Sequence, residues 1–245
     1  MPSLSQTSVR NYLLSGLTPA DYGLLQPHLE PVPFTKDMVL EEDDETFDHA
    51  YFPNTGVASI MAITQTGDRV EAGLFGREGM SGMPILLGAD RSPLKTIVQI
   101  PGEGYRIEVS ALRDAIEQSR SLHANLLRFC QAMVVQTACT TLANVTHCVE
   151  VRLARWLLMC HDRSDGDEVR LTHEYMAVIL AVRRPSVTIA VHTLEASGFI
   201  KAERGMITMR DQTGLVEFSE GSYGKPEAEY TRLIGPFFDG AEATF

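Results

Sequence analysis

The sequence predicts an α+β fold with an N-terminal β-roll, one long helix and a C-terminal winged helix-turn-helix. Three observations support this prediction. Short apolar runs divided by turn residues fill residues 32–107, helical periodicity covers residues 122–145, and residues 171–211 read as two short helices and a hairpin. These patterns divide the chain into four parts: residues 1–118, 119–146, 147–220 and a C-terminal tail, 221–245.

The composition is that of a globular chain with room for a core. Its 245 residues are 44% hydrophobic and carry a net charge of −11. No run approaches the roughly 18 uninterrupted apolar residues that a membrane span requires. The N-terminus lacks a charged segment followed by an apolar run, so we expect no secretory signal, no membrane partner and a cytoplasmic protein. The negative charge argues against a protein that coats nucleic acid without specificity.

The cysteines predict no metal site and no cofactor. The chain has four of them: Cys130, Cys139, Cys148 and Cys160. No two are spaced as C-x-x-C, whereas zinc sites and iron–sulfur clusters need ligands close together. We expect buried, reduced thiols, as a reducing cytoplasm favours. Haem binding is an open alternative, because His28, His49 and Cys130 could serve as ligands. A single histidine on a sheet or loop is, however, usually structural.

The N-terminal part is predicted to be a short helical lead-in followed by the β-roll. Thr18 is a favourable N-cap, and Pro19 suits the first position of the helix that follows. Apolar runs bounded by turn residues come next: Val57–Ile63, Val70–Phe75 and Thr96–Ile100. Strands this short at this spacing are typical of a small barrel, roll or sandwich.

A long helix is predicted over about residues 122–145. Its apolar residues recur at spacings of four, three and four, the pattern of a helix seam: Leu122, Leu126, Phe129 and Met133. One side of such a helix can cover the β-roll and the other a second copy, so these four residues are the predicted dimer interface. Packing within the chain alone is the alternative, because periodicity does not say what covers an apolar face.

Residues 171–211 predict the helix-turn-helix and its wing. Thr172 is a good N-cap for the first helix, and Pro185 fits the start of the second. The faces expected to be buried are Met176, Ile179 and Leu180 on the first helix, and Val187, Val191 and Leu194 on the second. Gly198 ends the second helix, and two short apolar runs around Glu203-Arg204-Gly205 then predict a hairpin.

The other face of the second helix carries the residues expected to contact double-stranded DNA. They are Arg183, Arg184, Ser186, Thr188, Ile189 and His192. Arginine can bond guanine in two places, serine several base edges, and an apolar side chain a thymine methyl. Contacts with the DNA phosphates are expected from Thr172 at the start of the first helix and from Lys201 and Arg204 on the wing. A plain helical hairpin with a solvated face is the alternative, and the wing and the paired arginines favour DNA.

The distribution of charge along the chain agrees with a protein that binds a specific DNA sequence. Residues 150–210 carry nine Lys and Arg against eight Asp and Glu, so the acidic excess lies outside them. A nearly neutral module with locally clustered cations, on an acidic body, is suited to a protein that avoids random DNA.

The order of β-roll, long helix and winged helix-turn-helix resembles the cyclic-AMP receptor protein and fumarate–nitrate regulator (CRP/FNR) superfamily of bacterial transcription regulators. The resemblance is strongest over residues 171–200 and only architectural over residues 30–145. It implies a cyclic-nucleotide-binding-like β-roll, a homodimer on an inverted repeat, and contact with RNA polymerase. Arg184 matches the family's arginine that contacts guanine, and Ser186 matches a hydroxyl residue that contacts the DNA backbone. Ile189 replaces the second base-reading arginine of the cyclic-AMP branch.

The effector pocket departs further from that branch. If Gly82 matches the family glycine, Met83 stands where an acid grips the ribose. Lys95 and Thr96 stand near the phosphate-binding triplet, with no arginine in register. Lys95 or Arg91 could substitute, but a lysine is a poor match for a bidentate arginine. We therefore expect no tight binding of cyclic AMP, and the absence of N-terminal cysteines disfavours the cluster chemistry of the fumarate–nitrate branch.

Two other functions compete with that of a regulator. A cupin-like metal enzyme needs an H-x-H pair, and His49 is the only histidine between residues 30 and 110. No P-loop, G-x-S-x-G or G-x-G-x-x-G motif occurs, so no catalytic residue is predicted. The acidic run 41–45 is expected to be solvated. A partner-binding adaptor that keeps the fold without reading DNA remains the alternative.

Overall fold

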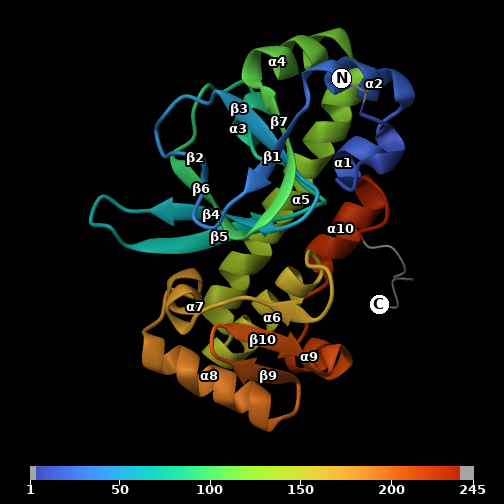
Figure 1. Cartoon of the computed structure of the whole chain (residues 1–245). Helices are drawn as coiled ribbons and strands as arrows, with labels where there is room; N and C mark the ends of the chain where they lie inside the picture. Colours follow the sequence, from blue (N-terminus) through green and yellow to red (C-terminus); the bar gives the residue numbers. More distant parts are fainter. Residues whose placement is uncertain (1–3, 238–245) are drawn as a thin grey trace.

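The computed structural model describes residues 4–237. It shows a β-roll at one end, a small α/β domain at the other, and a long helix that connects them (Figure 1). Ahead of the roll come four short elements: η1 (Gln6–Ser8), α1 (Tyr12–Ser15), α2 (Pro19–Leu25) and η2 (Gln26–His28). Thr18 caps α2 as predicted, because its hydroxyl accepts a hydrogen bond from the Asp21 amide.

The β-roll consists of two antiparallel sheets. One has the order β1-β7-β3 and contains β1 (Glu30–Phe34), β7 (Gly102–Glu108) and β3 (His49–Pro53). The other has the order β2-β6-β4-β5 and contains β2 (Val39–Glu41), β6 (Leu94–Ile100), β4 (Val57–Ile63) and β5 (Arg69–Phe75). The apolar runs of the sequence thus become strands, and Phe52, Phe75 and Ile107 lie buried between the sheets.

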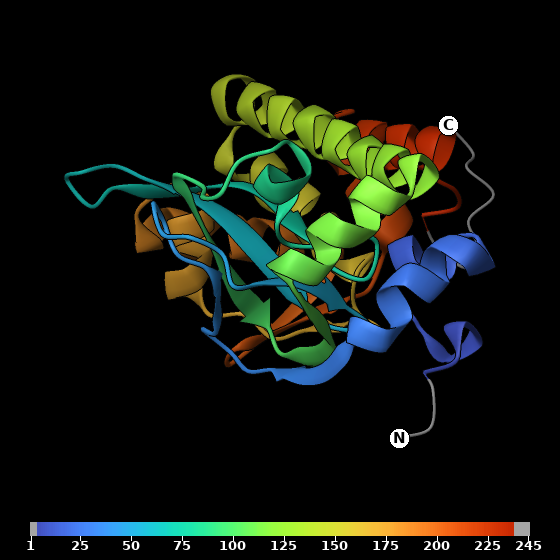
Figure 2. The same ribbon diagram turned by 90° about the horizontal axis from the view of Figure 1, so that it is seen from above.

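Three helices pack against the roll, and the last of them runs on toward the second domain (Figure 1). They are α3 (Met83–Leu86), α4 (Val109–Gln118) and α5 (Arg120–Thr146). Seen from above, α5 crosses the roll along its whole length, with α4 leading into it (Figure 2). Ser119 caps α5, and its side chain and that of Ser121 donate to the Asp21 carboxylate, which ties the start of α5 to α2.

The predicted dimer interface is wrong, because its residues are used inside the chain. Leu122, Leu126, Phe129 and Met133 are all buried in the core that α5 shares with the β-roll. Gln136 continues the same face, and its side-chain oxygen accepts a hydrogen bond from the Leu74 amide of β5. The spacing identified an apolar face correctly, but the roll covers that face, as the alternative interpretation allowed.

The second domain follows directly. Its elements are α6 (Val149–His161), β8 (Glu168–Val169), α7 (His173–Ile179), α8 (Arg184–Ala196), β9 (Ile200–Glu203), β10 (Met206–Met209) and α9 (Gln212–Phe218). The strands form an antiparallel sheet in the order β8-β10-β9. A separate apolar core holds this domain together, and the only tryptophan, Trp156, is part of it.

The described part of the C-terminal tail contains a helix. This helix, α10 (Lys225–Leu233), returns to pack along α5 (Figures 1 and 2). Tyr230 and Phe237 are buried there, and their rings meet edge to face at 5.1 Å. The apolar side chains of α10 and of the residues that follow it therefore join the core that α5 shares with the roll.

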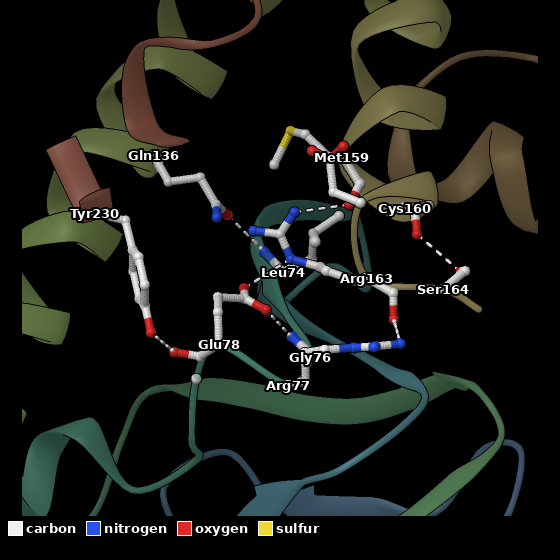
Figure 3. A network of polar contacts seen from close by, with 12 residues as sticks. Leu74, Gly76, Arg77, Glu78, Gln136, Met159, Cys160, Arg163, Ser164 and Tyr230 are labelled. Atoms are coloured by element: carbon white, nitrogen blue, oxygen red, sulfur yellow. Dashed lines mark hydrogen bonds and ion pairs between the residues drawn. The ribbon is translucent and has the colours of Figure 1, made fainter. Parts of the chain in front are cut away.

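A buried ion pair links the two domains beneath α10. Arg163, at the end of α6, is 1% exposed, and its Nε lies 2.7 Å from Oε1 of Glu78 in the loop after β5 (Figure 3). Its guanidinium also donates to the Met159 carbonyl and stacks on the Phe237 ring at 5.0 Å. Tyr230 donates to the Glu78 carbonyl at 2.9 Å. Breaking such a buried pair leaves an uncompensated charge, so these contacts fix how the second domain sits on the roll.

A second buried link holds α7. The Glu71 carboxylate of β5 accepts hydrogen bonds from the Trp156 indole of α6, at 2.7 Å, and from the Ser59 hydroxyl of β4. Ser59 also contacts the Tyr175 hydroxyl of α7 at 2.9 Å. The orientation of α7, and of the helix that follows it, is therefore tied to the sheet of the roll.

Candidate nucleic-acid interface

The two helices of the motif meet at a sharp angle. α7 and α8 are bent by 104° relative to each other, within the range of DNA-binding helix-turn-helix units. Thr172 caps α7 by accepting from the Tyr175 amide, as predicted. Met176, Ile179 and Leu180 are buried. Within residues 4–237 no single helix is long and apolar enough to cross a membrane, although α7 and α8 together satisfy that test as a bent pair.

Local chemistry places the start of α8. Arg183 has an extended backbone and precedes the helix, so Arg184 is its first residue and Pro185 its second. Proline is favourable in this first turn because the amide it lacks has no partner inside the helix. The predicted inner face is buried, and Ala190 belongs to it as well as Val187, Val191 and Leu194.

The outer face of α8 is open to solvent. In Figure 1 this helix forms the lower edge of the molecule, remote from the β-roll. Arg183, Arg184 and His192 are exposed, and Ile189 is 61% exposed although it is apolar. Among the described residues, neither Arg183 nor Arg184 has an acidic partner for its side chain. Two uncompensated guanidinium groups at the first turn of an outward helix can form hydrogen bonds with an external acceptor.

Two of the residues predicted to contact DNA are less exposed than the others. Thr188 is half-buried, and its hydroxyl lies 3.1 Å from Nδ1 of His173 and 3.3 Å from the Arg184 carbonyl. It therefore joins α8 to α7. Ser186 is also half-buried. Helical spacing placed both on the outer face, but the spacing does not show how closely the first helix approaches.

The wing is the β9–β10 hairpin. Arg204 is exposed at its tip beside Gly205, whose φ of 75° suits glycine. Lys201 is exposed but lies 2.6 Å from Glu203, so part of its charge is neutralised. Arg210, at the far end of β10, is exposed too.

Thr172 lies apart from the other predicted contacts. It lines a cleft between α7 and the β-roll, opposite Lys36 and Gln99. Arg170, just before α7, lines the same cleft. The structure thus brings together the outer face of α8 and places Thr172 against the roll.

The four predicted pocket residues do not form an anion site. The Gly82 amide and the Thr96 hydroxyl both donate to the Glu41 carboxylate, the latter at 2.6 Å. Lys95 forms an ion pair with Glu42 at 2.6 Å. Met83 lines a cavity of about 450 Å³ between the roll and α5, whereas Lys95 lines the cleft between α7 and the roll.

Glu41 is the residue that sequence reasoning missed at this site. It was read as part of a solvated acidic run, but it is buried, and burial raises its pKa despite the two donors. Its position after the apolar Val39-Leu40 pair in a strand was the available signal. Arg91 is also unsuited to replace a pocket arginine, because it is exposed and pairs with Asp90.

The described residues show no cluster of three or more histidine, cysteine, aspartate or glutamate side chains that could hold a metal ion. The four cysteines are unpaired, and Cys130 and Cys160 are buried. Burial raises the pKa of the Cys130 thiol to about 11, so this thiol stays protonated and behaves as a small apolar group.

The fold and the outer face of α8 define a winged helix-turn-helix protein with a β-roll. Comparison with known proteins makes this more specific. Residues 151–218 match the model of the Crp-like helix-turn-helix domain. No curated protein sequence matches the chain.

Solved structures share the whole architecture at low identity. FixK2 from Bradyrhizobium japonicum is 16% identical, with a TM-score of 0.67 over 78% of this chain and 96% of its own. A putative transcriptional regulator of the CRP/FNR family from Eubacterium rectale is 15% identical, with a TM-score of 0.66 over 85% of this chain and 98% of its own. A CRP-family transcriptional regulator from Thermus thermophilus is 16% identical, with a TM-score of 0.63 over 79% of this chain and 98% of its own.

The chain therefore has the fold of the CRP/FNR regulators and carries a Crp-like helix-turn-helix domain, which confirms the resemblance seen in its sequence.

Proposed function

We propose that this protein is a transcription regulator, without enzymatic activity, that reads a specific double-stranded DNA site with α8. The observation that carries the proposal is the outer face of α8, where Arg183 and Arg184 lie exposed and, among residues 4–237, without acidic partners, while the inner face is buried. The second helix of such a unit enters the major groove and presents its first residues to the base edges. Exposed Ile189 is available for a thymine methyl and His192 for a base edge or a phosphate.

The wing and the roll have supporting roles in this proposal. Arg204 at the tip of the hairpin is suited to a phosphate, and so is Arg210. Thr172, Ser186 and Thr188 are also proposed DNA contacts, although they are less accessible than the arginines. Thr172 lines the cleft toward the roll, Thr188 contacts His173 of α7, and Ser186 is half-buried. Following the family resemblance, we also propose a cytoplasmic location and contact with RNA polymerase.

We further propose that the protein acts as a homodimer through the outer face of α5. Exposed or half-exposed residues recur there at spacings of four and three: Leu127, Gln131, Val134, Ala138, Thr141 and Val145. Val134 and Val145 are 63% and 82% exposed. Large apolar side chains exposed at seam spacing are typical of a helix that pairs with its counterpart. A two-fold dimer would read an inverted repeat whose half-sites lie about one helical turn apart.

Selection of random double-stranded DNA by the purified protein tests the proposal. An enriched inverted repeat is expected, with affinity that falls steeply as salt rises. On the selected site, Arg184→Ala should cost about 1–3 kcal/mol of binding free energy and relax the preference at one base pair. The matched control is Arg120→Ala, an exposed arginine at the start of α5.

Unchanged affinity of Arg184→Ala for the selected site would remove α8 from the reading role. If the selection enriches no sequence at all, the partner-binding adaptor is the better explanation.

A further inference from the structure

Residues 222–237, which include α10, cover a cluster of charged side chains, and we refer to this segment as the strap. The strap cluster consists of Glu78 in the loop after β5, Arg155, Asp162 and Arg163 at α6, and Glu227 in the strap itself. Asp162 is half-buried, and the other four are buried. Three carboxyl groups thus share this region with two guanidinium groups. Charges in a protein interior are costly unless each is paired or neutralised.

One ion pair accounts for two of these charges. Arg163 pairs with Glu78 at 2.7 Å (Figure 3). Arg155 instead donates from Nε to a backbone carbonyl of the strap at 3.0 Å, and its Nη2 is buried without a hydrogen-bond partner among residues 4–237. One oxygen of Glu227 accepts from a backbone amide at the start of α10, and the other is buried and unpartnered within the same range. Arg155 is therefore the remaining guanidinium for two carboxyl groups, those of Asp162 and Glu227.

The groups around the strap cluster supply no free cation in the part of the chain that the structure describes. The titratable groups that face the cluster are Tyr12 in α1, Glu71 in β5, Arg77 after β5, Cys139 in α5, Cys160 in α6, and Tyr223 and Tyr230 in the strap. Arg77 is the one cation in this set, and it is already paired with Asp165. Glu71 adds a further carboxyl group that acts on both buried arginines. Ionisation of Asp162 and Glu227 together would thus leave the cluster with a net negative charge.

Protons are the remaining means of balancing this charge. The cavity beside Glu227 and Arg163 measures about 10 Å³, which is room for about one water molecule and not for a hydrated counter-ion. Burial raises the pKa of Glu227, and it raises the pKa of Asp162 to about 8, with a further contribution from the charge of Glu227. Both carboxyl groups therefore favour the protonated form while the strap is attached. Release of the strap would bring them into water, where the charged form is no longer disfavoured.

We propose that the strap is a pH-sensitive restraint on the second domain, attached while Asp162 and Glu227 hold at least one proton between them and released as both ionise. The start of the strap is coupled to this event, because Tyr223 donates a hydrogen bond to Asp162 at 2.7 Å. A carboxyl group whose pKa is higher in the attached state binds its proton more tightly there. Attachment is therefore strongest in acid and weakens as the pH rises, between 3.8 and about 8 for Asp162. The proposal goes beyond DNA reading and does not depend on it.

Hydrogen exchange of the full-length protein tests the proposal, measured by mass spectrometry at pH 6 and pH 8 and corrected for the intrinsic effect of pH on exchange. A helix of nine residues is not stable alone, so release exposes the amides of α10. Protection of α10 should fall at least about tenfold, because dependence on one proton amounts to a factor of ten per pH unit. Helix α4, at the far end of the roll, should lose less protection (Figure 1). Equal protection of α10 at both pH values, or an equal loss in α4, would overturn the proposal.

Neutral replacements identify the groups that titrate. Asp162→Asn and Glu227→Gln keep acceptor oxygens but cannot ionise, so the double variant should keep α10 equally protected at pH 6 and pH 8. Asp114→Asn, at an exposed position of α4, should behave like the wild type. Tyr230→Phe removes the hydrogen bond to the Glu78 carbonyl, and it should lower the protection of α10 by a similar factor at both pH values. Wild-type pH dependence in the double variant would contradict the proposal. If the double variant does not fold, the comparison of the wild type at the two pH values decides.

Discussion

Glu71 is a buried titratable residue at the contact between the roll and the second domain. It is fully buried at the contact between β5, β4 and α6. Burial raises its pKa to about 7, although the Ser59 and Trp156 hydrogen bonds and the charges of Arg155 and Arg163 act in the opposite direction. The protonated carboxyl is thus favoured in the folded state below neutral pH.

This shift has a definite consequence for stability. Between the ordinary glutamate pKa of 4.5 and about 7, the folded state holds a proton that the unfolded state releases. The free energy of unfolding therefore falls as pH rises through this window, by about 3 kcal/mol for this group. Asp162, whose pKa burial raises to about 8, acts in the same direction.

We expect Glu71→Gln to remove the Glu71 share of this loss, because the amide oxygen still accepts hydrogen bonds and does not ionise. Urea unfolding at pH 5.5 and pH 8 should show a smaller difference for the variant than for the wild type. Glu217→Gln, at an exposed position of α9, should leave the difference unchanged. Equal pH dependence in wild type and Glu71→Gln would mean that Glu71 is ionised in the folded protein.

At the scale of elements, the turn between α7 and α8 contains a strained residue. Ala181 has a φ of 49°, in the left-handed region that glycine adopts without cost. Its conformation is set by the turn, since the Val182 amide bonds back to the Ala177 carbonyl. The turn thus holds α8 in place at the expense of some backbone strain.

Ala181→Gly should raise the free energy of unfolding by about 0.5–1 kcal/mol, because relief of strain outweighs the greater freedom of the unfolded chain. The same replacement in a regular helix, Ala124→Gly in α5, should lower it by about 1 kcal/mol. Urea unfolding of the two variants distinguishes these opposite signs, and DNA affinity should not change in either. A loss of stability in Ala181→Gly would show that the turn is not strained.

The elements also show what the sequence could and could not predict. The motif was predicted closely because caps, turn residues and helical periodicity are local: Thr172 caps α7, and Val187 and Leu194 are buried. The α5 face was assigned to the wrong partner, since its cover comes from strands far away in the chain. Glu41 was missed for the same reason, because its donors lie at Gly82 and Thr96.

At the scale of the whole molecule, the outer face of α5 is the apolar surface that the proposed dimer would bury. Val145→Asp places a charge on its most exposed valine. We expect the mass in solution to fall from twice 27.0 kDa toward 27.0 kDa, because a pair of facing carboxylates would have to lose water. Analytical ultracentrifugation measures this. Glu117→Gln in α4, away from this face, is the control, and a mass equal to that of the wild type in Val145→Asp would contradict dimerisation through α5.

The packing of α10 against α5 attaches the second domain to the roll a second time, in addition to the covalent connection. The second domain is attached to the roll covalently, through α5 and α6, and again where α10 runs back along α5 (Figure 1). A domain attached at one hinge can swing freely. A domain that is held at several separate points can turn only if α10 slides on α5, Phe237 leaves Arg163 and the Glu71–Trp156 hydrogen bond breaks. The orientation of α8 relative to the roll is thus restrained. Any signal that reorients α8 must supply the free energy needed to disrupt the packing of α10 on α5.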